Sequence, residues 1–354
     1  MVTTTKRIPR PKRHTQSPAK RVGLVDVARE AGVSPATVSR VRHNKPVVIP
    51  EARNRVLKTA ARLNYRPHFS ARNLARGRTG HIAIATPRGS HHLFSSPYVT
   101  RVLDGIGQVL DETSMRLILS TTPAQFEDLT SSHVVDGILL LEVAMKDPYL
   151  DVLESSDIPV VLIGDYKKKT RFTVFTPDYE SAIRMGVEHL VELGHTEIGF
   201  LCGPPNRYKW KANQDTFQTL VKEFNLREIG SVISPDYEEK TGYRLFSERL
   251  EKRMPLPSCY VSTSDFLASG FMRAALGHGL SVPGDLSMVS YGDIPIAALS
   301  RPPLTTVGGQ FVDVGANAAR TLIDLIEGKD NSPVRYTIPL DLILRESAGR
   351  PAQG

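Results

Sequence analysis

The sequence predicts an N-terminal all-α head with a helix-turn-helix, followed by an α/β body of two doubly wound parallel-sheet subdomains. Three observations support this fold class. Residues 24–44, LVDVAREAGVSPATVSRVRHN, carry the apolar spacing and turn signals of two short packed helices. Positive charge is concentrated in the first 80 residues. From His81 onward, short apolar runs alternate with amphipathic helices, which is typical of parallel sheets covered on both faces.

The first helix of the motif is predicted to carry one apolar stripe and to end at a glycine. The stripe consists of Leu24, Val27, Ala28 and Ala31. These positions recur at helical spacing, so they lie on one face of the helix. Gly32 follows at once, and glycine adopts the positive φ of a tight helix stop without strain.

The second helix is predicted to start at Pro35 and to expose polar side chains. Ser34 can accept hydrogen bonds from the first N–H groups of this helix, and proline fits its first position. Val38 and Val41 point back to the small core. The polar residues that face away from it are Thr37, Ser39, Arg40 and His43. Two packed helices that present Thr, Ser and Arg from the second member indicate a reader of the DNA major groove.

A third helix is predicted from Pro50 to the residue before Arg66, because a residue that precedes proline is disfavoured in the α conformation. The next segment, residues 67–80, contains a short helix-capable stretch that is not stable alone in water. Two interpretations stay open for it. It is either a plain linker or a hinge helix that orders on DNA and inserts Leu74 into the minor groove.

The net charge of +8 combines a basic head with an acidic body. Residues 1–80 hold 19 Lys and Arg against three acidic residues, and the rest of the chain has an acidic excess of 8. This asymmetry indicates a polyanionic partner for the head alone. Residues 1–21 are predicted to be a disordered basic arm, which either adds phosphate contacts or has no role. They contain no apolar core of a secretory signal.

Several classes of protein are disfavoured by what the sequence lacks. No run of about 18 apolar residues is present, so no membrane attachment is expected. Cys202 and Cys259 give no disulfide framework and suit free thiols in a reducing cytoplasm. We find no nucleophile elbow, phosphate loop or metal-spaced His/Cys cluster, so we expect no catalytic residues, no metal and no cofactor. The expected location is the cytoplasm, in association with the nucleoid.

The body is predicted from alternating apolar runs and helices. The runs are 81–87, 115–121, 135–141, 158–164, 197–203, 257–263 and 286–292, and the helices between them include 98–113, 178–193, 211–224, 241–251 and 265–279. About 270 residues exceed what one such sheet usually needs, so two subdomains are expected. Ligands bind at the carboxyl ends of strands in open α/β sheets, which places a candidate site there.

The chain resembles the LacI (lactose repressor) family of bacterial transcription regulators. The motifs that carry the resemblance are Asp26-Val27-Ala28, Ala31-Gly32-Val33-Ser34, Thr37-Val38-Ser39-Arg40-Val41, Ala71-Arg72-Asn73-Leu74, Val135-Asp136-Gly137-Ile138, Ile158-Pro159-Val160-Val161, Leu193-Gly194-His195, Gly203-Pro204-Pro205, Val282-Pro283-Gly284-Asp285-Leu286-Ser287 and Pro302-Pro303-Leu304-Thr305-Thr306-Val307. Their order and spacing make the resemblance specific over nearly the whole chain.

The resemblance implies a homodimer on a pseudo-palindromic double-stranded DNA operator, with a periplasmic-binding-protein type I-like body hinged over a small-molecule effector. The expected domains are residues 22–66 for DNA binding, 67–80 for the hinge and 81–350 for effector binding and dimerisation. The first subdomain would cover about 81–174 plus 305–330, and the second about 175–304 plus 331–350. The chain ends without the heptad segment of the family's tetramers, so a dimer is expected.

The family's DNA contacts can be transferred to matching positions of this chain. They fall on Ser34, Pro35, Ala36, Thr37, Ser39, Arg40, His43, Asn44, Ala71, Arg72 and Leu74. Arg40 would read a guanine through its bidentate fork. Ser34, Thr37 and Ser39 would mainly hold phosphates, which fixes register without reading sequence. His43 stands where the family usually has Asn.

The expected effector contacts depart from the family pattern. They fall on Tyr98, Trp210, Asn213, Tyr237, Ser264, Asp265, Gly292 and Asp293. Asn213 replaces a customary Arg, and Gly292 replaces an Asp, so one charge of each sign is lost together. Trp210 either stacks on the ligand or packs its loop. In the long segment 88–96, His91 and His92 are expected to point apart with no carboxylate beside them, so no metal site is predicted there.

Three interpretations of function follow. The favoured one is a repressor controlled by a carbohydrate-related ligand that is larger or less polar than a simple monosaccharide. The second is a regulator of the same family whose cleft no longer responds to any small molecule. The third, a solute-binding receptor, would need a signal peptide and no basic head. The sequence leaves open whether the effector induces or co-represses, and whether the protein represses or activates.

Overall fold

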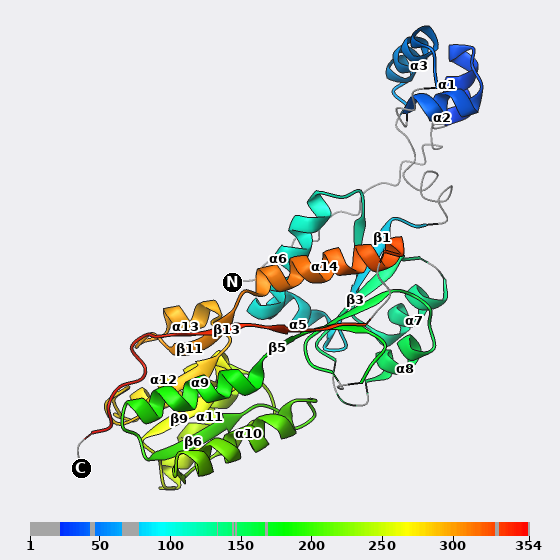
Figure 1. Ribbon diagram of the computed structural model, residues 1–354. Coiled ribbons are helices and arrows are strands. Elements are labelled where there is room, and N and C mark those ends of the chain that lie inside the picture. Colours follow the sequence, from blue (N-terminus) through cyan, green and yellow to red (C-terminus); the bar gives the residue numbers. More distant parts are fainter. Residues whose placement is uncertain are drawn as a thin grey trace, which may run out of the picture. The chain divides into compact units, whose positions relative to one another are not determined.

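The computed structural model describes residues 22–42, 47–65, 78–132, 134–143, 145, 147–166, 169–329 and 333–352 (Figure 1). The chain divides into two compact units, one up to Gly77 and one from Arg78 onward, and each is described by itself. Several predictions lie outside the described residues. They concern the arm 1–21, His43, Asn44 and the hinge residues Ala71, Arg72, Asn73 and Leu74.

The head consists of α1 (Leu24–Ala31), α2 (Pro35–Arg42) and α3 (Pro50–Arg62). Its core is formed by the apolar side chains that the spacing predicts, namely Val27, Ala28, Ala31, Val38, Val41 and Val56. Gly32 ends α1 with a φ of 62°, as expected for a left-handed helix stop. Arg62 of α3 pairs with Glu30 of α1 at 2.7 Å, which adds a surface link between these two helices. The predicted helix-turn-helix is therefore confirmed.

The first subdomain of the body is built on a six-stranded sheet in which all neighbouring strands are parallel. Its strands are β1 (His81–Ala85), β2 (Arg116–Ser120), β3 (Gly137–Leu141), β4 (Val160–Ile163), β5 (Thr173–Pro177) and β12 (Arg335–Ile338), in the order β12-β5-β4-β3-β1-β2. Strands β3 and β4 are buried throughout, as their continuous apolar runs predict. Strand β5, which none of the predicted runs covers, is buried as well. Strand β2 lies at an edge, where Leu117 and Leu119 are exposed, so the expectation that both faces are covered fails there.

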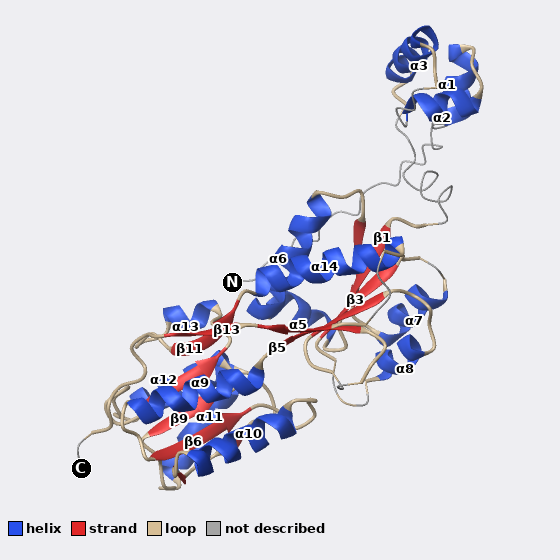
Figure 2. Cartoon of the chain, in the orientation of Figure 1, coloured by secondary structure: helices blue, strands red, loops and turns tan. Residues whose placement is uncertain are grey.

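Helices cover both faces of this first sheet (Figures 1 and 2). On one face, α5 (Gly89–Ser95), α6 (Pro97–Asp111) and α14 (Phe311–Glu327) pack against the side chains of Ile82, Ile84 and Leu139. On the other face, α7 (Pro123–Ser131) and α8 (Pro148–Glu154) pack against Ala83 and Ile138. The alternation of side chains along β1 and β3 thus separates two apolar cores.

The second subdomain is built on a second, mostly parallel sheet. Its strands are β6 (Glu197–Cys202), β7 (Arg227–Glu228), β8 (Val232–Ile233), β9 (Cys259–Ser262), β10 (Ser287–Tyr291), β11 (Thr305–Gly309) and β13 (Leu340–Ile343), ordered β13-β11-β10-β9-β6-β7 with β8 also paired to β6. Helices α9 (Tyr179–Glu192) and α10 (Trp210–Glu223) cover one face. Helices α11 (Glu239–Glu251) and α12 (Asp265–Gly277) cover the other, and α13 (Pro295–Leu299) packs beside α12.

The chain passes between the subdomains at places that differ from the predicted limits. Residues 305–330 were expected in the first subdomain; α14 packs there as expected, but β11 pairs with β10 in the second sheet. Residues 331–350 were expected in the second, but β12 pairs with β5 in the first. Only β13 returns to the second sheet, and it is antiparallel to β11. The physical reason is that β11 and β12 are short and carry no apolar run, and the sheet that a short strand joins is decided by distant segments of the chain.

Candidate DNA-binding surface and ligand cleft

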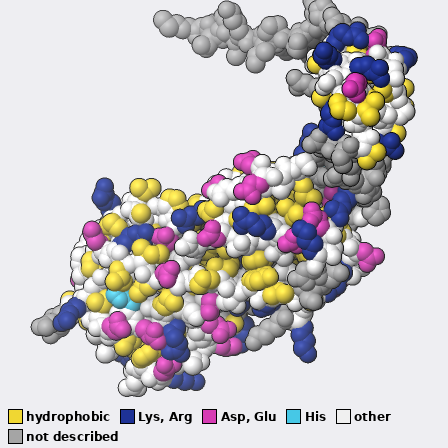
Figure 3. Space-filling view, turned by 45° about the horizontal axis from the view of Figure 1, so that its top comes forward, with side chains coloured by type: hydrophobic (Ala, Val, Ile, Leu, Met, Phe, Trp, Pro, Cys, Tyr) yellow, Lys and Arg dark blue, Asp and Glu magenta, His cyan; other side chains and the backbone are white. Residues whose placement is uncertain are grey.

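Helix α2 presents the predicted DNA-contacting residues at the surface of the head. The backbone N–H of Thr37 donates to Ser34 Oγ at 3.1 Å, so Ser34 caps α2 as predicted. Ser34, Pro35, Ala36 and Arg40 are exposed, and Thr37 and Ser39 are half-buried. Figure 3 shows Lys and Arg side chains on the visible face of the head. The helix can therefore offer the Arg40 guanidinium and small polar groups to a duplex.

A cleft of about 560 Å³ lies between the two subdomains of the body. Its lining includes residues that follow the carboxyl ends of β1, β3, β4, β6, β9 and β10, which is where open α/β sheets bind ligands. The volume falls within the range of small-molecule sites. The predicted residues that line it are Tyr98, Trp210, Asn213, Tyr237, Ser264, Asp265 and Gly292.

Three of these residues carry buried polar atoms with no hydrogen-bond partner in the described part of the protein. They are Tyr98 Oη, Trp210 Nε1 and Asn213 Oδ1. Asn213 is only 7% exposed. Trp210, the first residue of α10, also packs against the apolar core that α9 and α10 cover. Its ring therefore contributes to this core as well as to the cleft wall. Buried polar groups are normally paired, so these atoms indicate partners that a ligand would supply.

Aromatic rings hold their places in the cleft by packing. Tyr98 meets Phe311 edge to face at 4.9 Å between ring centroids. The Tyr237 ring lies against the backbone of Gly203, where a Cβ atom would come within 2.1 Å of Tyr237 Cε1. Burial raises the pKa of Tyr237 to about 12, and burial next to Glu142 raises the pKa of Tyr98. Both phenols therefore stay protonated and can donate a hydrogen bond at neutral pH.

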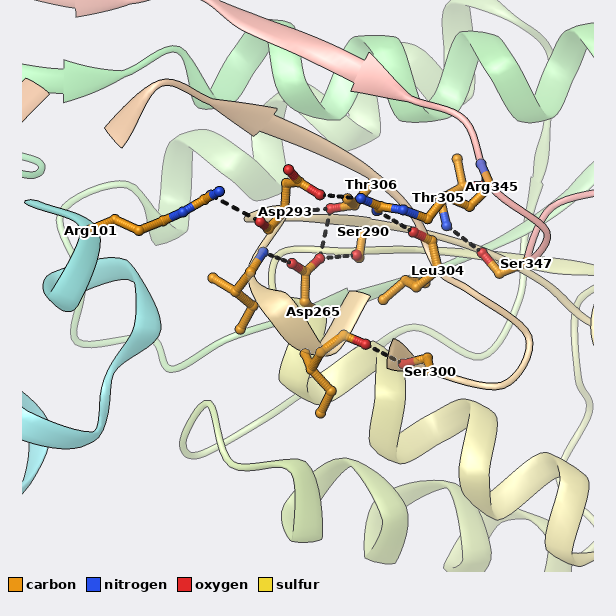
Figure 4. Close-up of polar contacts among 12 residues, drawn as sticks. Arg101, Asp265, Ser290, Asp293, Ser300, Leu304, Thr305, Thr306, Arg345 and Ser347 are labelled. Carbon is orange, nitrogen blue, oxygen red and sulfur yellow. Dashed lines mark hydrogen bonds and ion pairs between the residues drawn. The ribbon is translucent and has the colours of Figure 1, made fainter. Parts of the chain in front are cut away.

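The carboxylate of Asp265 is occupied by the protein itself (Figure 4). It accepts hydrogen bonds from Ser290 Oγ, from Thr306 Oγ1 at 2.7 Å and from the backbone N–H of Ile294 at 2.9 Å. Burial raises its pKa, and these hydrogen bonds act against that rise. Ser264, its neighbour, caps α12. The structure gives Asp265 a role in joining α12 to β10 and β11.

Asp293 does not line the cleft, in contrast to the prediction for this residue. Its carboxylate pairs with Arg345 at 2.6 Å, and its carbonyl oxygen accepts a hydrogen bond from Arg101 at 3.0 Å (Figure 4). Gly292 has a φ of 136°, and a Cβ atom there would lie 3.0 Å from Asp265 Oδ2. A carboxylate at position 292 would be strained and would be repelled by Asp265, which explains the glycine.

The structure adds a charged cluster that the sequence did not reveal. Arg88 pairs with Glu142 at 3.1 Å, and His92 Nε2 contacts the other carboxylate oxygen of Glu142. The expectation that no carboxylate stands beside the histidines is therefore wrong. Burial would raise the pKa of Glu142, but the His92 hydrogen bond and the Arg88 and Arg207 charges lower it to about 2. The sequence signal that could have revealed this cluster is position, because Arg88 and Glu142 closely follow the carboxyl ends of β1 and β3.

Charged contacts also cross the cleft. Arg207 Nη1 donates to the carbonyl oxygen of Glu142 at 3.1 Å. Lys209 Nζ lies 4.0 Å from Asp165 Oδ1 and 5.7 Å from the centre of the Tyr179 ring. Burial raises the pKa of Asp165 to about 6, although the Lys209 charge works to lower it. The loop between β6 and α10 therefore connects the second subdomain to the first at the cleft.

Two further features concern possible metal ligands and membrane-spanning helices among the described residues. The described residues include no group of three or more His, Cys, Asp or Glu side chains placed to hold a metal ion. Across the same ranges, no helix is long and apolar enough to cross a membrane. Cys202 and Cys259 are both buried free thiols, and burial raises the pKa of the Cys202 thiol to about 11.

Two family models match this chain. Residues 23–68 match the model described as bacterial regulatory proteins, lacI family, and residues 187–348 match the periplasmic binding protein-like domain. Catabolite control protein A from Priestia megaterium is 31% identical over 85% of this chain and 91% of its own length. The ribose operon repressor of Halalkalibacterium halodurans is 31% identical over 91% of this chain and 96% of its own length.

Solved structures agree with these matches. The lac repressor dimer bound to operator and the anti-inducer ONPF has a TM-score of 0.81 at 26% identity, covering 93% of this chain and all of that chain. The complex of transcriptional regulator CelR with cellobiose has a TM-score of 0.70 at 26% identity, covering 92% of this chain and all of that chain. With a helix-turn-helix head and a two-sheet body in common, the chain belongs to the LacI family of bacterial regulatory proteins and is a DNA-binding transcription regulator.

Proposed function

We propose that this regulator is a homodimeric repressor whose operator affinity is set by a carbohydrate-related small molecule bound in the cleft. The observation that carries the proposal is the group of unpartnered buried polar atoms on Tyr98, Trp210 and Asn213 in a cleft of about 560 Å³. Sugar hydroxyls both donate and accept, so they can satisfy an indole N–H, an amide oxygen and a phenol together. Aromatic walls supply the apolar contact that sugar rings need.

The names of relatives favour the same class of ligand. A ribose operon repressor and a regulator solved with cellobiose both share the architecture of this chain. A homodimer is proposed because the lac repressor structure to which this chain is similar is a dimer on its operator. Those relatives are regulators, and no enzymatic activity is proposed. The proposed location is the cytoplasm, on the nucleoid.

Arg40 is the residue proposed to read a base, and its replacement by alanine gives a direct test. Arg40→Ala is expected to cost about 1–3 kcal/mol of operator binding at one base-pair position, because a bidentate contact to guanine is lost. The phosphate contacts made by the other residues of the head should contribute to binding as they do in the wild type. Fluorescence anisotropy with the operator and its single-base variants, at fixed salt, measures the effect.

Lys58→Ala on α3 is the matched control, since it removes one positive charge from the same head. It should weaken binding to all duplexes alike and leave base preference intact. If Arg40→Ala weakened binding to operator and to scrambled DNA equally, Arg40 would hold only a phosphate.

Ser34, Pro35, Ala36, Thr37 and Ser39 remain proposed contacts of α2. His43, Asn44, Ala71, Arg72 and Leu74 remain proposed contacts outside the described residues.

The effector proposal is tested by ligand-dependent stability and operator release. A ligand at about 100 times its Kd adds roughly 2.7 kcal/mol to the native state, which raises Tm by about 2–4 °C in a protein of this size. We expect such a shift from a subset of a panel of mono- and disaccharides, sugar acids, sugar phosphates and nucleosides. The same compounds should change operator affinity in anisotropy titrations.

The two readouts separate the proposed function from its alternatives. A compound that shifts Tm and operator affinity together supports a ligand-controlled repressor, because linkage makes the coupling reciprocal. A panel without any Tm shift would favour a family member with an unresponsive cleft. A compound that shifts Tm without changing operator affinity would show a binding module uncoupled from the head.

A further inference from the structure

Arg207 is a cation in the cleft wall that forms no ion pair with any described carboxylate, although the charge of Glu142 acts on it from a longer distance. It follows β6 in the loop that leads to α10 and lines the cleft. Its hydrogen bond goes to a backbone carbonyl, that of Glu142, at 3.1 Å. The Glu142 carboxylate is held by Arg88 and His92. Arg207 therefore donates its hydrogen bond to the peptide of Glu142, while the carboxylate of that residue is in contact with Arg88 and His92.

The local charge balance is positive on this side of the cleft. Two guanidinium groups, those of Arg88 and Arg207, act on the single carboxylate of Glu142, with the His92 ring also against it. Burial and the neighbouring Arg88 lower the pKa of Arg207. A buried charge is costly unless it is paired, because the protein interior solvates ions poorly. The described groups on this side of the cleft thus leave one guanidinium charge unbalanced.

Other acidic groups of the cleft wall are engaged elsewhere. Asp165 lies opposite Lys209, and Glu239 pairs with Arg273 at 2.6 Å. Asp236 accepts hydrogen bonds from Thr241 and from the backbone of Glu238. Glu238 also lines the wall, but its exposed carboxylate forms no ion pair with Arg207, and neither does any other described carboxylate of the cleft. A ligand can therefore supply the anion.

We infer that the ligand of this cleft carries an acidic group, a carboxylate or a phosphate, that binds Arg207. The planar guanidinium matches either oxyanion with two parallel hydrogen bonds, which are stronger than bonds between neutral groups. The inference rests on the proposed function, since it specifies the class of sugar derivative. It differs from the sequence-based expectation of a ligand that is larger or less polar than a simple monosaccharide, since that expectation rests on Asn213 and Gly292 alone and takes no account of Arg88 and Arg207.

The test compares neutral sugars with matched acids in the full-length protein. The probes are glucose, glucuronate, gluconate and glucose 6-phosphate, with the corresponding galactose and cellobiose series. Isothermal titration gives Kd, and anisotropy gives the change in operator affinity. We expect one acidic member to bind at least about tenfold tighter than its neutral partner, as one charge-assisted hydrogen bond predicts. The carboxylate and phosphate arms identify which oxyanion the site takes.

Variants then assign the effect to Arg207. Arg207→Gln should weaken binding of the preferred acid by about 10–100-fold and leave its neutral partner within about threefold. Arg207→Lys keeps the charge without the fork and should fall between them. Lys222→Gln, which removes an exposed cation of α10 that does not line the cleft, is the control and should change the acid's Kd by less than about threefold. Unchanged Tm without ligand verifies the fold of each variant.

The possible outcomes separate this inference from the proposed function. If neutral sugars bind and change operator affinity while their acids do not, the ligand is uncharged and the inference is wrong, but a sugar-controlled repressor stands. If the acids bind equally well to wild type and Arg207→Gln, Arg207 is not the anion site. If no member of the panel binds, the proposed function fails and the inference fails with it.

Discussion

Asp265→Ala is expected to lower the free energy of unfolding by about 3 kcal/mol. The substitution leaves three donors without their acceptor inside the second subdomain, where Asp265 is only 1% exposed. These donors are Ser290 Oγ, Thr306 Oγ1 and the backbone N–H of Ile294 (Figure 4). Each buried unsatisfied group costs about 1–3 kcal/mol, and the hydroxyls recover part of that by rotating. Urea unfolding measures the loss, with fluorescence of the single tryptophan, Trp210, reporting on this subdomain.

Asp265→Asn is the matched variant, because it keeps the shape and one carbonyl oxygen. Its oxygen can accept from the Ile294 N–H while its amide donates to the rotated hydroxyls, so the loss should be smaller, about 1 kcal/mol. If both variants kept the wild-type free energy of unfolding and lost only ligand binding, the Asp265 carboxylate would bind the effector, as the sequence predicts.

The helical head was predictable nearly residue by residue because its signals are local. The apolar stripe, Gly32, the Ser34 cap and Pro35 act within a few residues, so spacing alone reports them. The body required long-range information. Strand β12 forms an edge of the first sheet, and β11 lies between β10 and the edge strand β13 of the second, so both pair with distant segments. No periodicity in residues 305–338 distinguishes one sheet from the other.

The cleft shows the same division between local and long-range signals. Tyr98, Trp210, Asn213 and Tyr237 were found by resemblance and line the cleft. Arg88 and Glu142 were missed although they interact directly, because 54 positions separate them and nothing local links them. Asp293 was expected at the cleft because it follows β10. In the structure, the backbone of Asp293 is left-handed (φ 45°), and its carboxylate pairs with Arg345 and does not line the cleft.

Gly105→Ala is expected to destabilise the first subdomain by about 3 kcal/mol, because α6 and α14 touch backbone to backbone. A Cβ atom at position 105 would lie 1.8 Å from the carbonyl oxygen of Val312, and one at Gly315 would lie 2.0 Å from that of Val102. The obstacle is helix backbone in both directions, so no side chain can rotate away. The helices must separate, and the core that they share loses packing. Far-UV circular dichroism during urea unfolding, at fixed protein concentration, measures the change.

Gly107→Ala, two residues along the same helix, is the control that isolates this contact. No heavy atom lies within 4 Å of its added Cβ, and α6 is helical on both sides. Alanine there should stabilise the protein by about 0.5–1 kcal/mol, since it restricts the unfolded chain and favours helix. Opposite signs for the two substitutions establish that the interlocked glycines set the α6–α14 distance. If Gly105→Ala and Gly107→Ala changed the free energy of unfolding equally, α14 would be free to shift over α6. Phe311 and Tyr98 at the cleft would then be positioned by other contacts.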